Sequence, residues 1–83
     1  MRNTNRNRDR EKLTKLFRSL REAAQLRQID LAKRLGKPQS FVSKYESGER
    51  RLDLPEIRSI CDALGISLKE FVEEFDRVTN ETE

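Results

Sequence analysis

Apolar residues recur every three or four positions along most of this 83-residue chain, which is the spacing of one α-helix face. The helical pattern begins near Asp9, and no apolar residue follows Met1 until Leu13. Residues 1–8 are therefore either a flexible basic arm or the frayed start of the helix. Leu26 is expected to close this helix against the next one. The apolar face of this first helix consists of Leu13, Leu16, Phe17, Leu20 and Ala24.

Two short helices follow, and glycine and proline mark their ends. Residues 28–35 form the first, which ends at Gly36 because glycine accepts the positive φ that follows a last helical turn. Pro38 opens the next helix, over about residues 39–46, since its fixed φ suits an N-terminal position. Gly48 ends this third helix. The inward-facing positions of the two helices are Leu31, Ala32, Leu35, Val42 and Tyr45.

Two capping boxes predict the start of two further helices. Asp53 is followed three residues later by Glu56, and Ser67 in the same way by Glu70. The fourth helix carries the stripe Ile57, Ile60, Cys61 and Leu64. The fifth, over about residues 68–77, carries Leu68, Phe71, Val72 and Phe75, with Val78 one turn on. With no alternating strand pattern, the sequence predicts an all-α, five-helix domain over residues 9–78 and a frayed acidic tail over residues 79–83.

The composition limits the chemistry of this domain. Hydrophobic residues make up 34% of the chain and charged residues 40%, so the core is small. Cys61, the single cysteine, lies on an inner stripe and is interpreted as a core residue rather than a redox group. Without histidine no metal site is expected, and no glycine-rich loop or pocket indicates an enzyme or a cofactor. No membrane span or secretory signal is apparent, so a cytoplasmic protein is expected.

The net charge of +3 conceals a change of sign along the chain. Residues 1–51 carry 15 Lys/Arg against 6 Asp/Glu, a balance of +9. Residues 52–83 carry 3 Lys/Arg against 9 Asp/Glu, a balance of −6. The first part suits a polyanion and the second would be repelled by it. Such segregation is also common on small protein surfaces, so charge alone does not distinguish a nucleic-acid partner from none.

The stretch of residues 28–48 carries the candidate function. On its second helix, Gln39, Ser40, Ser43 and Lys44 form a polar face opposite the apolar positions. A helix fits the major groove of B-DNA, where its first turn meets the base edges. Glutamine matches adenine, lysine reaches guanine or phosphate, and serine serves either. The face is therefore predicted to read bases, the alternative being an ordinary solvated helix face.

This region resembles the helix-turn-helix of the XRE type, the family of lambda repressor and Cro. The resemblance extends from about Leu16 to Phe71, and it includes LREAA at residues 20–24 and ALGISL at residues 63–68. It implies a five-helix, lambda-repressor-like DNA-binding domain with a central helix-turn-helix. Double-stranded DNA is the partner that the resemblance implies, and no cofactor is needed.

The resemblance also assigns roles to particular residues. Gln28 matches a glutamine that contacts phosphate and braces the first reading residue. Gln39 and Ser40 match the first reading positions, and Lys44 matches the next, one turn on. Glu46 matches an acid that faces back into the fold. The residues expected to contact the DNA backbone, besides Gln28, are Arg27, Lys37, Arg50 and Arg51.

Three residues depart from the family pattern. Arg27 stands where a capping Ser or Thr is common, and adds a cation near the DNA path. Pro38 stands where many members have Ser. Phe41 occupies a position that is more often small or polar. It either touches a thymine methyl group or packs beside Tyr45, and packing is favoured because residues 41 and 45 share a helix face.

Two basic segments leave alternatives open. Arg50 and Arg51 lie in the loop where family members touch the DNA backbone, and phosphate contact is favoured for both. The alternative is that they only pair with Glu49 and Asp53 across the loop, an exposed interaction of little energetic value. The arginine-rich arm either enters the minor groove, as homeodomain arms do, or makes no contact.

The apolar stripe of the fifth helix extends beyond its core positions. Val72, Phe75 and Val78 either lie against the first helix or form a subunit interface, and the interface is favoured. A two-fold dimer through this helix would place two recognition helices on palindromic half-sites about 34 Å apart. The acidic part of the chain would then face away from the DNA.

The preferred interpretation is a sequence-specific transcriptional regulator that acts as a homodimer on a palindromic operator. The alternative is a protein-interaction module, such as an antitoxin or co-regulator, with a protein partner and secondary DNA binding. The sequence distinguishes neither repressor from activator nor one operator from another.

Overall fold

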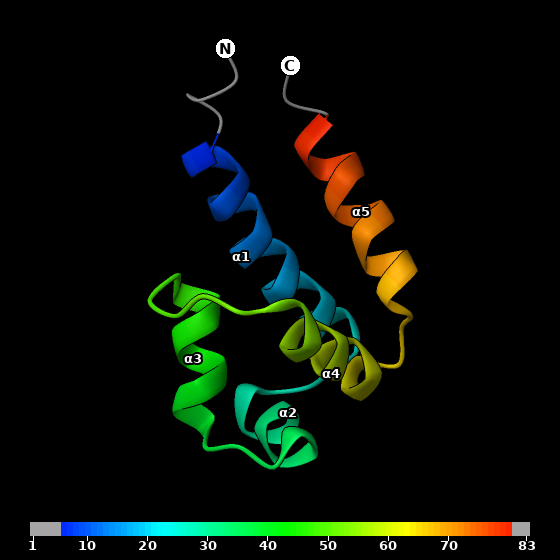
Figure 1. The fold of residues 1–83 in the computed structure, drawn as a ribbon. Coiled ribbons are helices and arrows are strands. Elements are labelled where there is room, and N and C mark those ends of the chain that lie inside the picture. The colour runs from blue at the N-terminus through cyan, green and yellow to red at the C-terminus, as the bar shows by residue number, and fades with distance from the viewer. Residues whose placement is uncertain (1–5, 81–83) are drawn as a thin grey trace.

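The computed structural model describes residues 6–80 and contains five helices and no strand in that range. Figure 1 shows α1 and α5 lying side by side, with α2, α3 and α4 gathered at one end of that pair. The all-α, five-helix prediction is therefore confirmed. The helices are α1 (Arg6–Ala23), α2 (Gln28–Leu35), α3 (Gln39–Ser47), α4 (Leu54–Leu64) and α5 (Leu68–Asn80).

The two outer helices are longer than the sequence pattern predicts. Helix α1 begins at Arg6 rather than near Asp9, so residues 6–8 of the predicted arm are helical. Helix α5 continues to Asn80, so residues 79 and 80 of the predicted tail are helical as well. The Nζ of Lys12 donates to the carbonyl of Val78 at 3.3 Å and ties the two helices together. Residues 1–5 and 81–83 lie outside the described range.

The core forms where the inner faces of all five helices meet, and aromatic rings join three of them. The ring of Phe17 on α1 lies 5.1 Å from that of Tyr45 on α3, edge to face. On its other side it stacks on Phe71 of α5 at 5.0 Å. Aromatic pairs at these distances stabilise a core beyond their buried area. The buried apolar residues are Leu16, Phe17, Leu31, Ala32, Val42, Tyr45, Ile60, Cys61 and Phe71.

Two positions on the predicted apolar faces are exposed. Ala24 was expected to continue the inner face of α1, and this was wrong, because the helix ends at Ala23 and the chain turns at Gln25, which has a φ of 61°. Val72 on α5 is 48% exposed. Cys61, by contrast, is fully buried, as the core interpretation requires. Burial raises the pKa of its thiol to about 11, which disfavours the nucleophilic thiolate.

The local signals at the helix ends act as the sequence predicts. Both capping boxes form: Asp53 accepts from the amide of Glu56 and Glu56 from that of Asp53. The Ser67–Glu70 pair makes the same reciprocal bonds. Gly36 and Gly48 have φ values of 68° and 88° and end α2 and α3. These two glycines therefore set the length of the two central helices.

Tyr45→Phe is expected to stabilise the domain by about 1 kcal/mol. The hydroxyl of Tyr45 is buried and has no hydrogen-bond partner within residues 6–80, and this burial raises its pKa. Removing it ends an uncompensated desolvation, whereas the ring contacts with Phe17 and Phe41 remain. Urea unfolding at constant m-value measures the change. A loss of stability would mean that the hydroxyl has a partner, such as a bound water.

Candidate nucleic-acid interface

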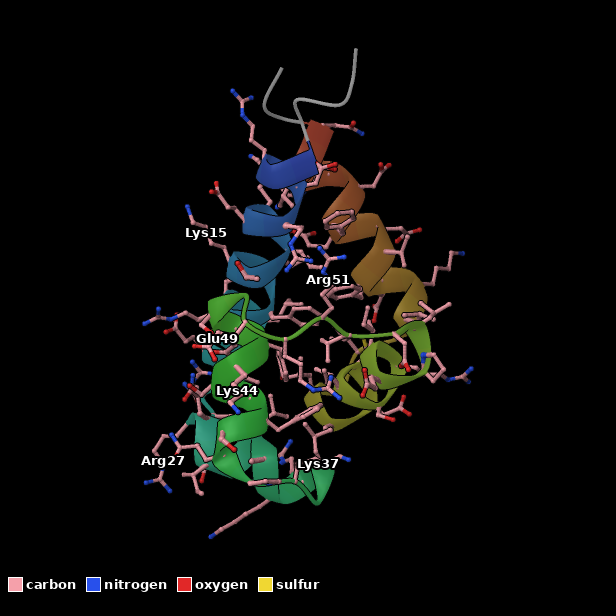
Figure 2. All side chains as sticks on the ribbon, turned by 60° about the vertical axis from the view of Figure 1, so that its left-hand side comes forward. Lys15, Arg27, Lys37, Lys44, Glu49 and Arg51 are labelled. Carbon is pink, nitrogen blue, oxygen red and sulfur yellow. The ribbon has the colours of Figure 1, made fainter. Side chains whose placement is uncertain are left out.

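A tight turn at Gly36 sets α3 across α2, and this pair presents one polar helix face to solvent. Val42 and Tyr45 point into the core and fix the rotation of α3. Figure 2 looks onto the opposite side of α3, where Lys44 projects outward. Such a face is accessible to the major groove of DNA. The exposed positions on it are the predicted base-reading residues Gln39, Ser40, Ser43 and Lys44.

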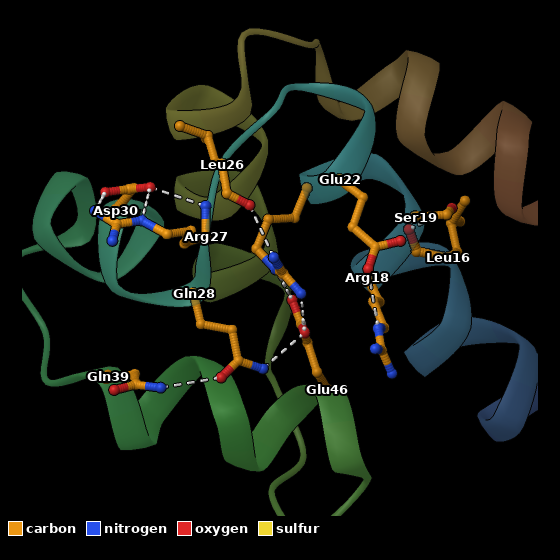
Figure 3. Close-up of polar contacts among 11 residues, drawn as sticks. Leu16, Arg18, Ser19, Glu22, Leu26, Arg27, Gln28, Asp30, Gln39 and Glu46 are labelled. Carbon is orange, nitrogen blue, oxygen red and sulfur yellow. Dashed lines mark hydrogen bonds and ion pairs between the residues drawn. The ribbon is translucent and has the colours of Figure 1, made fainter.

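A chain of hydrogen bonds runs from the core to the first residue of this face (Figure 3). The guanidinium of Arg21 donates to Glu46 through Nε at 2.7 Å and Nη2 at 3.0 Å. The Nε2 of Gln28 also donates to Glu46, at 3.0 Å. Gln39 then donates from its Nε2 to the Oε1 of Gln28 at 3.3 Å. Glu46 therefore faces into the fold, and Gln28 braces Gln39, as the resemblance implies.

The charge on Glu46 determines which way both amides point. A carboxylate only accepts hydrogen bonds, so Gln28 must turn its NH₂ group toward Glu46 and its oxygen toward Gln39. Gln39 must in turn donate its own NH₂ group to that oxygen. This leaves Gln39 with a carbonyl oxygen and one N–H that make no hydrogen bond within residues 6–80. An acceptor beside a donor is the pattern that matches the major-groove edge of adenine.

Arg27, the residue before α2, is held by the helix that it precedes. Asp30 accepts from the backbone N–H of Arg27 at 2.9 Å, and from its guanidinium at 3.0 and 2.9 Å. The carboxylate thus stabilises the start of α2, where the family usually has a capping Ser or Thr. The Arg27 side chain remains 77% exposed, and in Figure 2 it extends to the side of α2 and α3. It stays available to phosphate.

Arg27→Ala is expected to raise the pKa of Asp30 from about 2 toward its ordinary value of 3.8. The side-chain hydrogen bond from Arg27 is the largest cause of the lowered pKa, and the backbone bond from the same residue remains in the variant. Since the folded pKa is depressed, the contribution to stability is complete above pH 4 and is lost as the pH falls through 2. An NMR pH titration of the Asp30 carboxyl carbon measures the shift.

The matched control for this titration is Lys33→Ala. Lys33 lowers the pKa of Asp30 through Coulomb attraction without a hydrogen bond, and this is the smallest of the causes. The control is expected to move the titration far less than Arg27→Ala. Equal pKa shifts in both variants would show that nearby positive charge in general lowers the pKa of Asp30. The two hydrogen bonds from the Arg27 guanidinium would then have no special role.

Arg50 pairs with a different acid from those considered from sequence. Its guanidinium forms a two-pronged ion pair with Glu56, at 2.9 and 3.2 Å, and not with Glu49 or Asp53. Glu56 lies in the first turn of α4 and turns back to cap that helix, which carries its carboxylate toward the loop. The pair lowers the pKa of Glu56 and raises that of Arg50. Arg51 is exposed.

Phe41 packs as the sequence favours, and it also organises the charges around it. Its ring meets Tyr45 edge to face at 5.4 Å. The Nζ of Lys37 lies 5.4 Å from the ring centre, and the Cζ of Arg50 lies 4.8 Å from it. Sequence reasoning missed this cluster and the role of Glu56. The one available signal was the aromatic residue at a usually small or polar position.

The predicted interface residues on α5 differ in exposure. Phe75 is half-buried and packs against the core, while Val78 is half-buried in a groove between α1 and α5. Val72 remains largely exposed. Thus part of the stripe does lie against α1.

Within residues 6–80, no helix is long and apolar enough to cross a membrane.

Comparison with known proteins gives one family match and several similar structures. A family model described as helix-turn-helix matches residues 17–71. An XRE-family like protein from Pseudomonas syringae pv. tomato str. DC3000 is 39% identical, over 92% of this chain and 93% of its own, with a TM-score of 0.83. The clp gene regulator ClgR from C. glutamicum is 26% identical, over 82% and 87%, with a TM-score of 0.73. The search of curated sequences gave no match.

A further structure supports the fold alone. A point mutant of the restriction-modification controller protein C.Esp1396I is 21% identical, over 90% of this chain and 95% of its own, with a TM-score of 0.83. Two short helices joined by a tight turn, the second with an exposed polar face, define a helix-turn-helix DNA-binding domain. The chain belongs to the helix-turn-helix family of the XRE type. Members of this family are DNA-binding transcriptional regulators, and the chain carries their fold.

Proposed function

We propose that this protein is a sequence-specific transcriptional regulator that binds a palindromic operator as a homodimer. The observation that carries the proposal is the hydrogen-bond chain that ends at Gln39. The hydrogen bond to Gln28 restricts the side chain of Gln39 and costs conformational entropy. On a helix face that binds nothing, this cost would bring no functional gain. Bracing instead prepares the amide to meet a base edge before DNA arrives.

Base reading is assigned to the exposed face of α3. Gln39 reads adenine through its remaining donor and acceptor, while Ser40, Ser43 and Lys44 contact neighbouring bases. The hydroxyls of Ser40 and Ser43 and the ammonium group of Lys44 make no hydrogen bond to any other residue in the range 6–80, so all three are available. Backbone contacts come from Gln28, Arg27, Lys37, Arg50 and Arg51, and they supply much of the affinity.

Dimerisation is assigned to α5, with Val72 at the centre and the exposed edges of Phe75 and Val78 beside it. A valine that is 48% exposed on a helix otherwise rich in charge is the residue that a second copy would cover. Two-fold pairing through α5 also repeats α3 at a fixed spacing, which a palindrome requires. A domain of this size gains stability from such pairing.

The experiment is selection of bound sequences from a random duplex pool at two salt concentrations, with the stoichiometry measured by sedimentation. The expected result is a palindromic consensus with half-sites about one helical turn apart, and a dimer on each duplex. Salt-sensitive binding without any consensus would overturn base reading, and would favour a module whose main partner is a protein. A consensus of one half-site, bound by a monomer, would overturn the dimer alone.

A further inference from the structure

The ring of Phe41 connects two basic residues that come from different sides of the recognition helix. Lys37 belongs to the turn before α3, and Arg50 belongs to the loop after it. Both cations lie within 5.5 Å of the ring centre, close enough for attraction to the ring face, at distances of 5.4 and 4.8 Å. Tyr45 supports the ring from the core side. Phe41 is therefore held in place and holds both cations in turn.

The guanidinium of Arg50 is anchored on one edge and open on another. Nη1 donates to Glu56 and to the carbonyl of Arg51, and Nη2 donates once to Glu56. These bonds use three of the five N–H donors that an arginine carries. The N–H of Nε and the second N–H of Nη2 have no acceptor within residues 6–80. They share one edge of the group, and such an edge binds phosphate through two parallel hydrogen bonds.

We propose that Phe41 is a positioning residue that holds Lys37 and Arg50 over its ring as a preformed subsite for DNA phosphates. The inference rests on the proposed DNA-binding function and adds a residue that touches neither base nor phosphate. An arginine on a free loop loses much of its rotamer freedom on binding phosphate. Here the stacking on Phe41 and the ion pair with Glu56 already restrict the Arg50 side chain in the folded protein. Less rotamer freedom is then lost on binding phosphate, so more of the contact energy appears as affinity.

The geometry separates this role from two simpler ones. A Phe41 that read a thymine methyl group would need an exposed ring, but this ring is half-buried between Tyr45 and the two cations. A Phe41 that merely filled space would not require its neighbours to be charged. Lysine in the turn and arginine in the loop are both exposed, and both cations lie over the same ring.

The test is a double-mutant cycle on affinity for the selected operator and for an unrelated duplex. Phe41→Leu keeps an apolar side chain against Tyr45 but removes the ring. It is expected to weaken binding to both duplexes by the same factor, roughly threefold to tenfold. Phe41→Trp is expected to restore binding because tryptophan provides the strongest ring face for a cation. In a protein that already carries Lys37→Ala and Arg50→Ala, Phe41→Leu is expected to have no further effect.

Three outcomes would overturn the proposal. An equal effect of Phe41→Leu with and without the two cations would make the ring purely structural. A loss confined to one base pair of the operator would make Phe41 a base reader. No loss in Phe41→Leu, with unfolding curves showing all variants folded, would leave the ring without any role in binding. A wild-type protein that binds no duplex would instead refute the proposed function, which separates the two failures.

Discussion

Replacing Glu46 by alanine is expected to destabilise the domain by about 3–5 kcal/mol, because the change leaves a buried guanidinium without its counter-ion. The side chains of Arg21 and Glu46 are only 9% and 4% exposed. Arg21 would keep one partner, the carbonyl of Leu26 at 2.8 Å, which cannot neutralise its charge. Since small domains have only about 5–15 kcal/mol of stability, the variant is expected to be largely unfolded at moderate urea concentrations.

Two further variants give this result its meaning. Glu22→Ala is the control, since it also removes a glutamate from an ion pair with arginine. In this pair the side chains of Arg18 and Glu22 are 66% and 56% exposed. It is expected to cost less than about 1 kcal/mol. Glu46→Gln keeps the shape and loses the charge, so it remains folded and measurable, with an intermediate loss of about 1–3 kcal/mol. If Glu46→Ala costs no more than Glu22→Ala, burial of the pair has no energetic consequence.

Gln39→Ala is expected to weaken binding to the selected operator by about 1–3 kcal/mol, a factor of roughly five to 150, and to relax the preference at one base pair. The bracing by Gln28 and Glu46 directs the Gln39 amide outward with a fixed donor and acceptor. The wrong base would leave these groups unpaired in a dry interface, which is why a single amide can discriminate strongly. Repeating the selection with the variant, and titrating duplexes changed one base at a time, measures both effects.

Asn80→Ala is the control for that comparison. It removes an exposed carboxamide from the end of α5, and the same selection is expected to return the wild-type consensus and affinity. An unchanged base preference in Gln39→Ala would take Gln39 out of the reading role, even if its affinity fell. Weaker binding to every duplex alike would instead make it a backbone contact.

Local chemistry explains why so much of the fold could be predicted from the chain alone. The capping boxes at Asp53 and Ser67, and the glycines at 36 and 48, act within a few residues of themselves, so tertiary contacts did not alter them. The apolar inner faces of the helices could also be predicted, because a helix face repeats every three to four residues. The polar face of α3 followed from the same periodicity. The family resemblance added the expected roles of Gln28 and Glu46 in the site.

The helix ends without a local signal were less predictable. Helix α1 starts at Arg6, three residues before the start predicted near Asp9, and polar Arg6, Asn7 and Arg8 carry no periodicity that would reveal it. Ala24 fitted the inner face by spacing, yet the turn at Gln25 removed it from the helix. Contacts with distant residues, such as Arg10 with the carbonyl of Gly48 at 3.3 Å, accompany these departures.

The sequence by itself determined the five helices, their inner faces and the polar face that makes α3 a candidate reader, because these features depend on neighbours in the chain. The tertiary structure decided which charges meet. Arg21 pairs with Glu46, 25 positions away in the sequence, and Gln39 bonds to Gln28, 11 positions away. Arg50 pairs with Glu56 and not with Glu49 or Asp53, which are nearer in the sequence. Long polar side chains reach many partners, and only the packing of the helices selects among them.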